Sequence, residues 1–157
     1  MSKRSGMVER DLGWKKISRA ISHAGMKPHV LIGIQADEKG TSEEGVPIVE
    51  YAFYNEFGSQ DGRRPPERSF IRSTSDEKRP QWDRLMARMW NGIIAGRVDI
   101  RTGLGIAGQQ AEKDIKRKIV TLRTPGNAES TKEAKQSTNP LIDEGAMLGA
   151  IRHEVKA

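Results

Sequence analysis

Apolar side chains recur at helical spacing near the start of the chain. After Asp11, a candidate N-cap residue, a helix is predicted by Trp14, Ile17, Ile21 and Ala24. Gly25 and Pro28 end this helix. Residues 29–34, HVLIGI, then form a short run of β-branched and apolar residues, which predicts a largely buried strand.

Residues 46–58, VPIVEYAFYNEFG, fit two patterns. The spacing of Ile48, Tyr51, Ala52 and Phe57 suits one face of a helix, whereas VEYAFY also suits a strand. We expect a helix, with Gly58 as its C-terminal cap. A polar loop at residues 35–45 separates it from the strand.

A longer helix is expected in the middle of the chain. Thr74 and Glu77 offer a capping box, but Pro80 suits a first turn better than a helix interior, so we expect the helix to begin near Arg79. Gly96 ends it. One apolar stripe runs along it, formed by Trp82, Leu85, Met86, Met89, Trp90, Ile93 and Ile94.

The last third of the chain predicts a helix, a polar loop, a short helix and an edge strand. The first helix, stopped by Pro125, is indicated by Ala107, Ala111, Ile115, Ile119 and Leu122. Residues 124–140 contain no large apolar side chain, so this polar loop is either ordered by neighbours or disordered. The strand is expected at residues 152–156, after a short helix indicated by Leu141, Met147, Leu148 and Ile151.

The length of the chain predicts one domain over residues 1–157, because a chain of this size can bury most of its apolar surface in a single core. Only 35% of the residues are hydrophobic and 31% are charged, so the core is small and the chain gains from neighbours. The absence of cysteine excludes disulfides, thiol nucleophiles and cysteine-based zinc sites. No signal peptide or membrane span is expected, since no long apolar run occurs.

The net charge of +6 is distributed in blocks of opposite sign. Residues 1–28 carry seven basic and two acidic side chains, whereas residues 35–61 carry one basic and seven acidic side chains. Residues 62–101 are basic again, with ten basic against five acidic side chains. Such blocks favour head-to-tail docking of identical copies, because the acidic block of one copy can face a basic block of another.

Catalytic and cofactor signals are weak. GLGIAG at residues 103–108 has the spacing of a dinucleotide-binding loop, but the preceding RVDIR is too charged to be the required buried strand, which favours a flexible helix start instead. The three histidines, His23, His29 and His153, lack the paired spacing of a metal site. No Walker loop or Ser/His/Asp order appears. We therefore expect no enzyme, no cofactor and no metal.

Nucleic-acid binding has more support from the sequence. Four arginines surround the Pro-Pro sequence, and four basic residues lie along one predicted helix: Arg63, Arg64, Arg68, Arg72, Lys113, Lys116, Arg117 and Lys118. The nearby aromatics lie at positions more typical of a core or an interface than of base-stacking platforms. Contact with passing DNA and a nucleic-acid-binding regulator both stay open, whereas sequence readout is not expected.

Two motifs carry a resemblance to a known family. YNEFGS at residues 54–59, followed by PPERSFIRST at residues 65–74, resembles a pattern of the tail-completion, or neck, proteins of long-tailed bacteriophages. NPLIDEGAMLGAI at residues 139–151 is similar to a second motif of the same family. The motif residues are Tyr54, Asn55, Glu56, Phe57, Gly58, Phe70, Pro140, Leu141, Asp143, Gly145 and Ile151.

The resemblance implies an α+β fold, in which a small antiparallel or mixed sheet is packed by about four helices. It also implies a structural protein of the virion, without catalysis, that is assembled in the cytoplasm of the host bacterium. It implies a ring at the head-tail junction, for which we favour a hexamer over a dodecamer. The implied partners are head-closure or connector proteins and tail-tube or tail-terminator proteins. A tail terminator and a head-closure ring protein are the alternatives.

We interpret residues 58–73 as a projecting loop. In this interpretation Phe57 packs inward, Gly58 reverses the chain, and Phe70 returns it to the core. The prolines stiffen the loop, so that little entropy is lost when it docks on a neighbouring subunit. The predicted interface residues are Arg63, Arg64, Pro65, Pro66, Glu67, Arg68 and Arg72.

Overall fold

A computed structural model describes residues 27–35, 37–42, 45–58, 65–126, 141 and 145–157, together with five single residues between positions 14 and 25. In these ranges two strands and four helices follow one another in the order β1, α2, α3, α4, α6 and β2. The predicted α+β class is confirmed. Of the predicted helix at positions 11–25, only those five single residues are described, and each of them is helical. Most of the polar loop at 124–140 lies outside the described residues.

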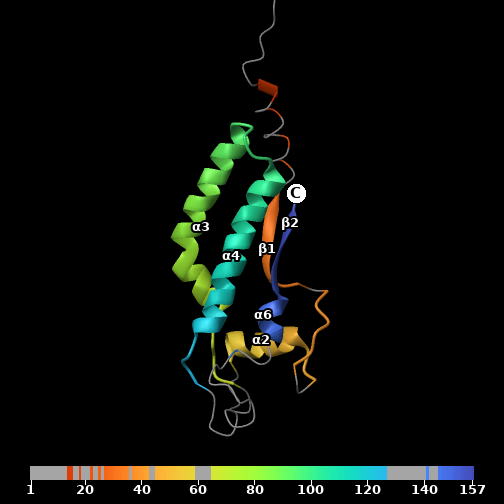
Figure 1. Cartoon of the computed structure of the whole chain (residues 1–157), viewed down its shortest axis with the longest axis vertical. Helices are drawn as coiled ribbons and strands as arrows, with labels where there is room; N and C mark the ends of the chain where they lie inside the picture. The colour runs from red at the N-terminus through yellow and green to blue at the C-terminus, as the bar shows by residue number, and fades with distance from the viewer. Residues whose placement is uncertain are drawn as a thin grey trace, which may run out of the picture.

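α3 (Ile71–Ile94) and α4 (Ile100–Thr121) form an antiparallel pair, which runs along the length of the molecule (Figure 1). The helices meet through a small core of Ile93, Ile100 and Leu104. At the turn between them, the side chain of Asp99 caps α4 by accepting a hydrogen bond from the backbone N–H of Thr102 at 2.9 Å.

The beginning of α3 differs from the prediction. The helix starts at Ile71, about two turns before Arg79, and Pro80 lies in its interior. Pro80 lacks an N–H, so the helix loses one backbone hydrogen bond there. The capping box expected at Thr74 is wrong, because Thr74 is buried inside the helix and its hydroxyl donates to the carbonyl oxygen of Phe70 at 2.6 Å.

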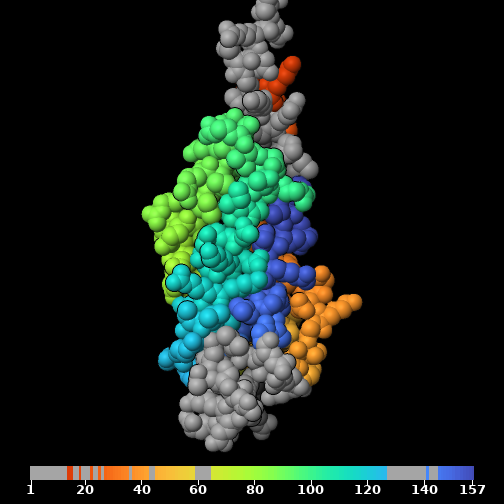
Figure 2. Space-filling view, viewed as in Figure 1, coloured from red at the N-terminus to blue at the C-terminus, as the bar shows by residue number. Residues whose placement is uncertain are grey.

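β1 (His29–Ile34) and β2 (Ile151–Lys156) form an antiparallel sheet, in which His29 pairs with Lys156 and Ile34 with Ile151. α4 packs on one face of this sheet, and the space-filling view shows α4 between α3 and the C-terminal residues (Figure 2). The expectation that β1 is largely buried is wrong. Exposed and partly buried positions alternate over its first four residues, because the sheet is covered on one face, and Leu31 is exposed.

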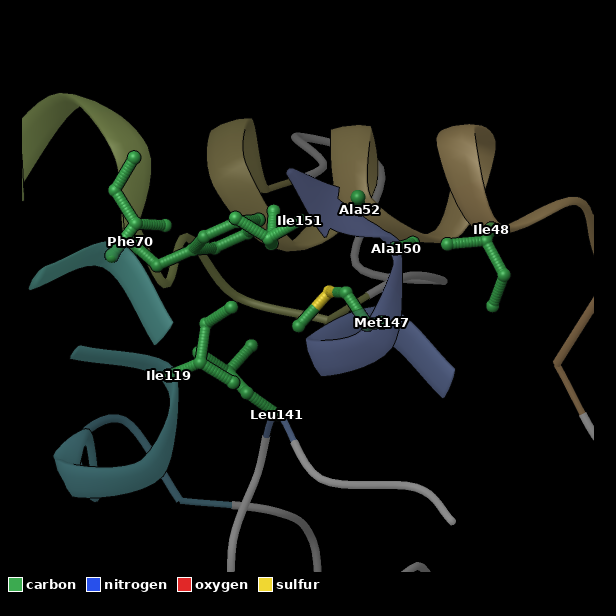
Figure 3. Packing of buried hydrophobic residues seen from close by; sticks show 9 residues of the cluster. Ile48, Ala52, Phe70, Ile119, Leu141, Met147, Ala150 and Ile151 are labelled. Atoms are coloured by element: carbon green, nitrogen blue, oxygen red, sulfur yellow. The ribbon is translucent and has the colours of Figure 1, made fainter. Parts of the chain in front are cut away.

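The main core lies at the end of the molecule where α2 (Ile48–Phe57) and α6 (Ala146–Ala150) meet the last turns of α4. Figure 3 shows the side chains of Phe70, Ile119, Leu141 and Met147 gathered between these helices. α2 confirms the expected helix at 48–57. The short helix and edge strand predicted near the C-terminus are also confirmed.

No helix of the described residues is both long and apolar enough to cross a lipid bilayer.

Candidate functional site at the junction of α2 and α3

Glu56, in the last turn of α2, caps the N-terminus of α3. Its Oε2 accepts hydrogen bonds from the backbone N–H groups of Phe70 at 2.8 Å and Ile71 at 2.9 Å, and its Oε1 accepts from that of Arg72 at 2.9 Å. These N–H groups have no partner within a helix, and a carboxylate there is also favoured by the helix dipole. One buried side chain therefore fixes the angle between two helices.

Further donors surround the same carboxylate. Ser69 Oγ donates to Oε1 at 2.8 Å, and Arg72 Nε lies 3.1 Å from Oε1. Burial opposes ionisation of Glu56, which is only 5% exposed, but hydrogen bonds from Ile71, Arg72, Phe70 and Ser69 outweigh it and lower the pKa of Glu56 below its ordinary value. Glu56 is thus held as a charged structural group.

Asn55 and Arg68 form a second buried contact beside the cap. The backbone N–H of Arg68 donates to the carbonyl oxygen of Asn55 at 2.7 Å, and Arg68 Nη1 donates to Asn55 Oδ1 at 3.3 Å. Arg68 Nε and Nη2 donate to the carbonyl oxygens of Pro125 and Gly126, each at 2.8 Å. Burial lowers the pKa of Arg68 from its very high ordinary value. Arg68 therefore ties the segment after α4 to α2.

The prediction that Arg68 belongs to an exposed arm is wrong, because only 4% of this residue is exposed. Arg68 lies close to Pro65 and Pro66 in the sequence, which suggested an exposed loop. Its carbonyl partners come from a distant part of the chain, so they could not be predicted from the neighbouring residues. Among the other predicted interface residues, Pro66, Glu67 and Arg72 are at least partly exposed. Arg63 and Arg64 lie outside the described residues.

Gly58 ends α2 and allows residues 65–69 to pack closely against it. Its φ of 68° is unfavourable for other residues, and its N–H donates to the carbonyl oxygen of Tyr54 at 2.8 Å. A Cβ atom at this position would lie 2.6 Å from the backbone nitrogen of Glu67. The predicted role of Gly58 as a cap is confirmed, and the close approach gives a second reason for glycine.

The outer side of α2 carries an exposed apolar stripe. Val49, Phe53 and Phe57 follow one another at four-residue spacing and are 47%, 56% and 50% exposed. The ring centroids of Phe53 and Phe57 are 4.8 Å apart, and the guanidinium carbon of Arg72 lies 4.4 Å from the Phe57 centroid. The expectation that Phe57 packs inward is wrong. We call these three residues the α2 stripe.

Tyr54 lies beside the α2 stripe and is partly exposed. Its ring contacts Phe53 edge-on, with centroids 6.0 Å apart, and its hydroxyl donates to Glu50 Oε1 at 2.9 Å. Phe70, by contrast, is fully buried, as expected. Of the four aromatic residues between positions 53 and 70, only Phe70 belongs to the main core.

The C-terminal motif contributes to the core beneath α2. Leu141 and Ile151 are buried there, and Gly145 has a φ of 77° at the start of α6. Pro140 and Asp143 lie outside the described residues. The two motifs thus meet at one end of the molecule, although about seventy residues separate them in the sequence.

GLGIAG does not form a loop. Residues 103–108 lie within α4, where a Cβ atom at Gly108 would approach Val30 and His153 side-chain atoms to 2.7 Å. This glycine therefore serves close packing of α4 on the sheet. Nearby, His153 Nδ1 lies 2.6 Å from Glu112 Oε2, and Lys116 Nζ lies 2.6 Å from Glu112 Oε1.

Within the described ranges, no group of three or more His, Cys, Asp or Glu side chains could hold a metal ion. His29 and His153 lie on the paired strands, and His23 is not described. On the basic face of α4, Lys116 and Lys118 pair with Glu112 and Glu77, at 2.6 Å and 2.5 Å, while Lys113 and Arg117 are exposed. This pairing reduces the positive charge that α4 offers to nucleic acid.

No protein-family model matches this chain, and the searches of curated proteins and of solved structures give no match either. The two sequence motifs and the geometry of the junction are therefore the features that bear on function.

Two features of the junction were not predicted from the sequence. The first is Glu56 as a cap, since it lies fourteen residues before Phe70 and helix-start signals are sought in the helix's own first residues. The second is the α2 stripe. Its signal was present, because Val49, Phe53 and Phe57 share a helix face that differs from the one containing Ile48 and Ala52.

Proposed function

We propose that this chain is a structural protein of the neck of a long-tailed bacteriophage. It forms a ring that completes the tail and joins it to the head-closure ring. The proposal rests on the resemblance of two sequence motifs to the tail-completion family. The observation that carries it furthest is the α2 stripe, because a chain that exposes two phenylalanines and a valine on one rigid helix face is suited to bind another protein.

The roles of the motif residues support this proposal. Glu56 holds α2 to the start of α3, and Asn55 and Gly58 contact the residues just before it. The helix that they fix presents the α2 stripe outward. A rigid support lowers the entropy lost when the stripe docks on a partner. The motif thus has a physical use in a protein whose task is assembly.

A ring follows from head-to-tail contacts when the rotation from one copy to the next divides a full turn. The opposite charges of residues 1–28 and 35–61 favour contacts of this kind. We propose a hexamer, with a dodecamer as the alternative, located in the neck of the virion between head-closure or connector proteins and tail-tube or tail-terminator proteins.

The proposal includes no catalysis. Glu56 and Glu112, two carboxylates with a lowered pKa, both use their oxygens to accept hydrogen bonds from groups of the same chain. We therefore assign these two carboxylates a structural role. Exposed Lys113 and Arg117 leave room for weak, sequence-independent contact with DNA that passes through the ring.

Head-tail joining tests the proposal. A phage with a disrupted copy of this gene is expected to produce separate filled heads and tails, and addition of the purified full chain restores joined, infectious particles. Electron microscopy and plaque counts measure the result. Phe53→Ser is expected to abolish joining, whereas Val120→Ser, a matched change of an exposed apolar residue on α4, leaves it intact. Heads and tails that join without the protein would refute the proposal.

A further inference from the structure

The α2 stripe has an acidic flank. Glu50 is exposed beside Val49 and Phe53, whereas Arg72, which lies over Phe57, is already paired with Glu56 and Glu67 at 3.1 Å and 2.7 Å. Among the described residues, the surface around the stripe is therefore apolar and, on balance, negative. A segment that covers it should offer apolar side chains with basic neighbours.

The first 26 residues of the chain have this composition. They contain six basic and two acidic side chains, and apolar residues recur at helical spacing from Trp14 onward. Trp14 is 69% exposed, and the described neighbours Lys15, Ser18 and Ser22 are exposed as well. The indole ring is thus not covered by the described part of its own chain.

The start of β1, which follows this segment in the chain, and α2 lie at opposite ends of the described structure (Figure 1). The segment joins the sheet at His29, which pairs with Lys156 near the beginning of α4, and α2 lies at the other end (Figure 1). To reach α2 of its own chain, the segment would have to return along the whole of β1, about 20 Å for six residues. In a head-to-tail row of copies, the two regions meet directly.

We propose that residues 1–26 of one copy dock on the α2 stripe of a second copy. Trp14 packs against Phe53 and Phe57, and Lys15 and Lys16 face Glu50. The inference rests on the proposed ring and names the contact that closes it. Aromatic packing supplies the affinity, and the opposite charges fix the orientation of the segment on α2.

Charge exchange between full-length variants tests this contact. Glu50→Lys places like charges together, and so does the double change Lys15→Glu with Lys16→Glu. Each variant alone is expected to self-associate roughly tenfold more weakly than the unchanged chain. An equimolar mixture restores association, because each contact in an alternating ring then joins opposite charges. Light scattering measures the mass of the assemblies over a range of concentrations.

Matched controls separate a local contact from a general charge effect. Asp83→Lys reverses an exposed acidic residue on α3, and Arg84→Glu with Arg88→Glu reverses two exposed basic residues on the same helix. These variants are expected to self-associate as the unchanged chain does. Circular dichroism is expected to be the same for all variants, since exposed charges contribute only about 0 to 1 kcal/mol to folding.

The outcomes distinguish this contact from the ring itself. An unchanged chain that stays monomeric would overturn both proposals. If the Glu50 and Lys15 variants form rings as readily as the unchanged chain, the contact would be overturned and the proposed ring would still hold. Variants that weaken association but are not rescued by mixing would show that the segment docks on its own chain, which also overturns the contact.

Cross-linking gives a second, independent measurement. The chain has no cysteine, so a Trp14→Cys chain mixed with a Phe53→Cys chain can form a disulfide only between copies. Mild oxidation is expected to give a cross-linked dimer, whereas a mixture with Leu31→Cys in place of Phe53→Cys gives little. Equal yields from the two mixtures would contradict the contact.

Discussion

The two sides of α2 differ in the burial of their side chains and in the groups that these side chains contact. On the inner side, Asn55 and Glu56 are buried, and groups of the same chain provide their hydrogen-bond partners. On the outer side, Phe53 and Phe57 are half exposed and contact one another, and Phe57 also contacts Arg72. Within ten residues, one side of a helix therefore specifies the fold, and the other is available for contact with another protein.

The largest effect on stability is expected for a change of Phe70, the buried aromatic residue that packs in the main core beneath α2. Phe70→Ala is expected to lower the free energy of unfolding by about 3 to 5 kcal/mol, because it leaves a cavity in the main core. Phe57→Ala, on the outer side, should cost less than about 1 kcal/mol. Chemical denaturation measures both. Equal losses would show that the two sides do not differ in burial.

Glu56→Gln should have the next largest effect. A neutral amide accepts hydrogen bonds through one oxygen and cannot satisfy the N–H groups that both carboxylate oxygens now serve. We expect a loss of roughly 1 to 3 kcal/mol, against about 0.5 kcal/mol or less for Glu50→Gln on the outer side. Thermal unfolding of the two variants compares them directly.

The stabilising effect of Glu56 is expected to depend on pH, which a comparison of the unchanged chain with Glu56→Gln can measure. The pKa of Glu56 is lowered in the folded state from an ordinary value of 4.5, so its stabilising contribution is complete above that value and is lost as pH falls through the folded-state pKa. The difference in unfolding free energy between the unchanged chain and Glu56→Gln should therefore shrink in acid. A difference that grows as pH falls would contradict the capping role.

Gly58→Ala tests the turn that separates the two sides. The positive φ and the approach of the Glu67 nitrogen to 2.6 Å predict a loss of roughly 1 to 2 kcal/mol. Gly105→Ala is the matched control, because that position is helical and open, so alanine should stabilise α4 by up to about 1 kcal/mol. Similar melting temperatures for the two variants would argue against the observed turn.

The smallest effect on folding is expected for the outer side itself. Phe53→Ser should change the unfolding free energy by no more than about 0.5 kcal/mol, since the ring is more than half exposed. Self-association, measured by sedimentation, should fall at the same time. A large loss of stability with unchanged association would reverse the roles that we assign to the two sides.

The elements of the fold could be predicted well from local patterns. The strand at 29–34, the helix at 48–57 and the C-terminal helix and strand followed from apolar periodicity and from glycine and proline positions. The start of α3 could not be predicted in this way. Its cap is supplied by Glu56, a residue of another helix, and local rules consider only side chains near the helix start.

The junction was harder to predict than the elements. The motif covers residues of the junction, but spacing alone did not show which aromatic residues are buried. Phe57 and Phe70 flank the same loop, yet one is exposed and the other buried, because α6 and the end of α4 cover only one side of α2. Arg68 shows the same limit, since its carbonyl partners lie nearly sixty residues away in the chain.

The antiparallel pairing of β1 with β2 has a consequence for the order of folding. α3 and α4 are neighbours in the chain and can pair by closing a short loop, whereas β1 must wait for a strand more than about a hundred residues later. Ile151, which begins that strand, also packs in the core beneath α2. A nascent chain that lacks β2 therefore has no finished support for α2. In the ring that we propose, a subunit would become competent to assemble only after this slowest, most distant contact has formed.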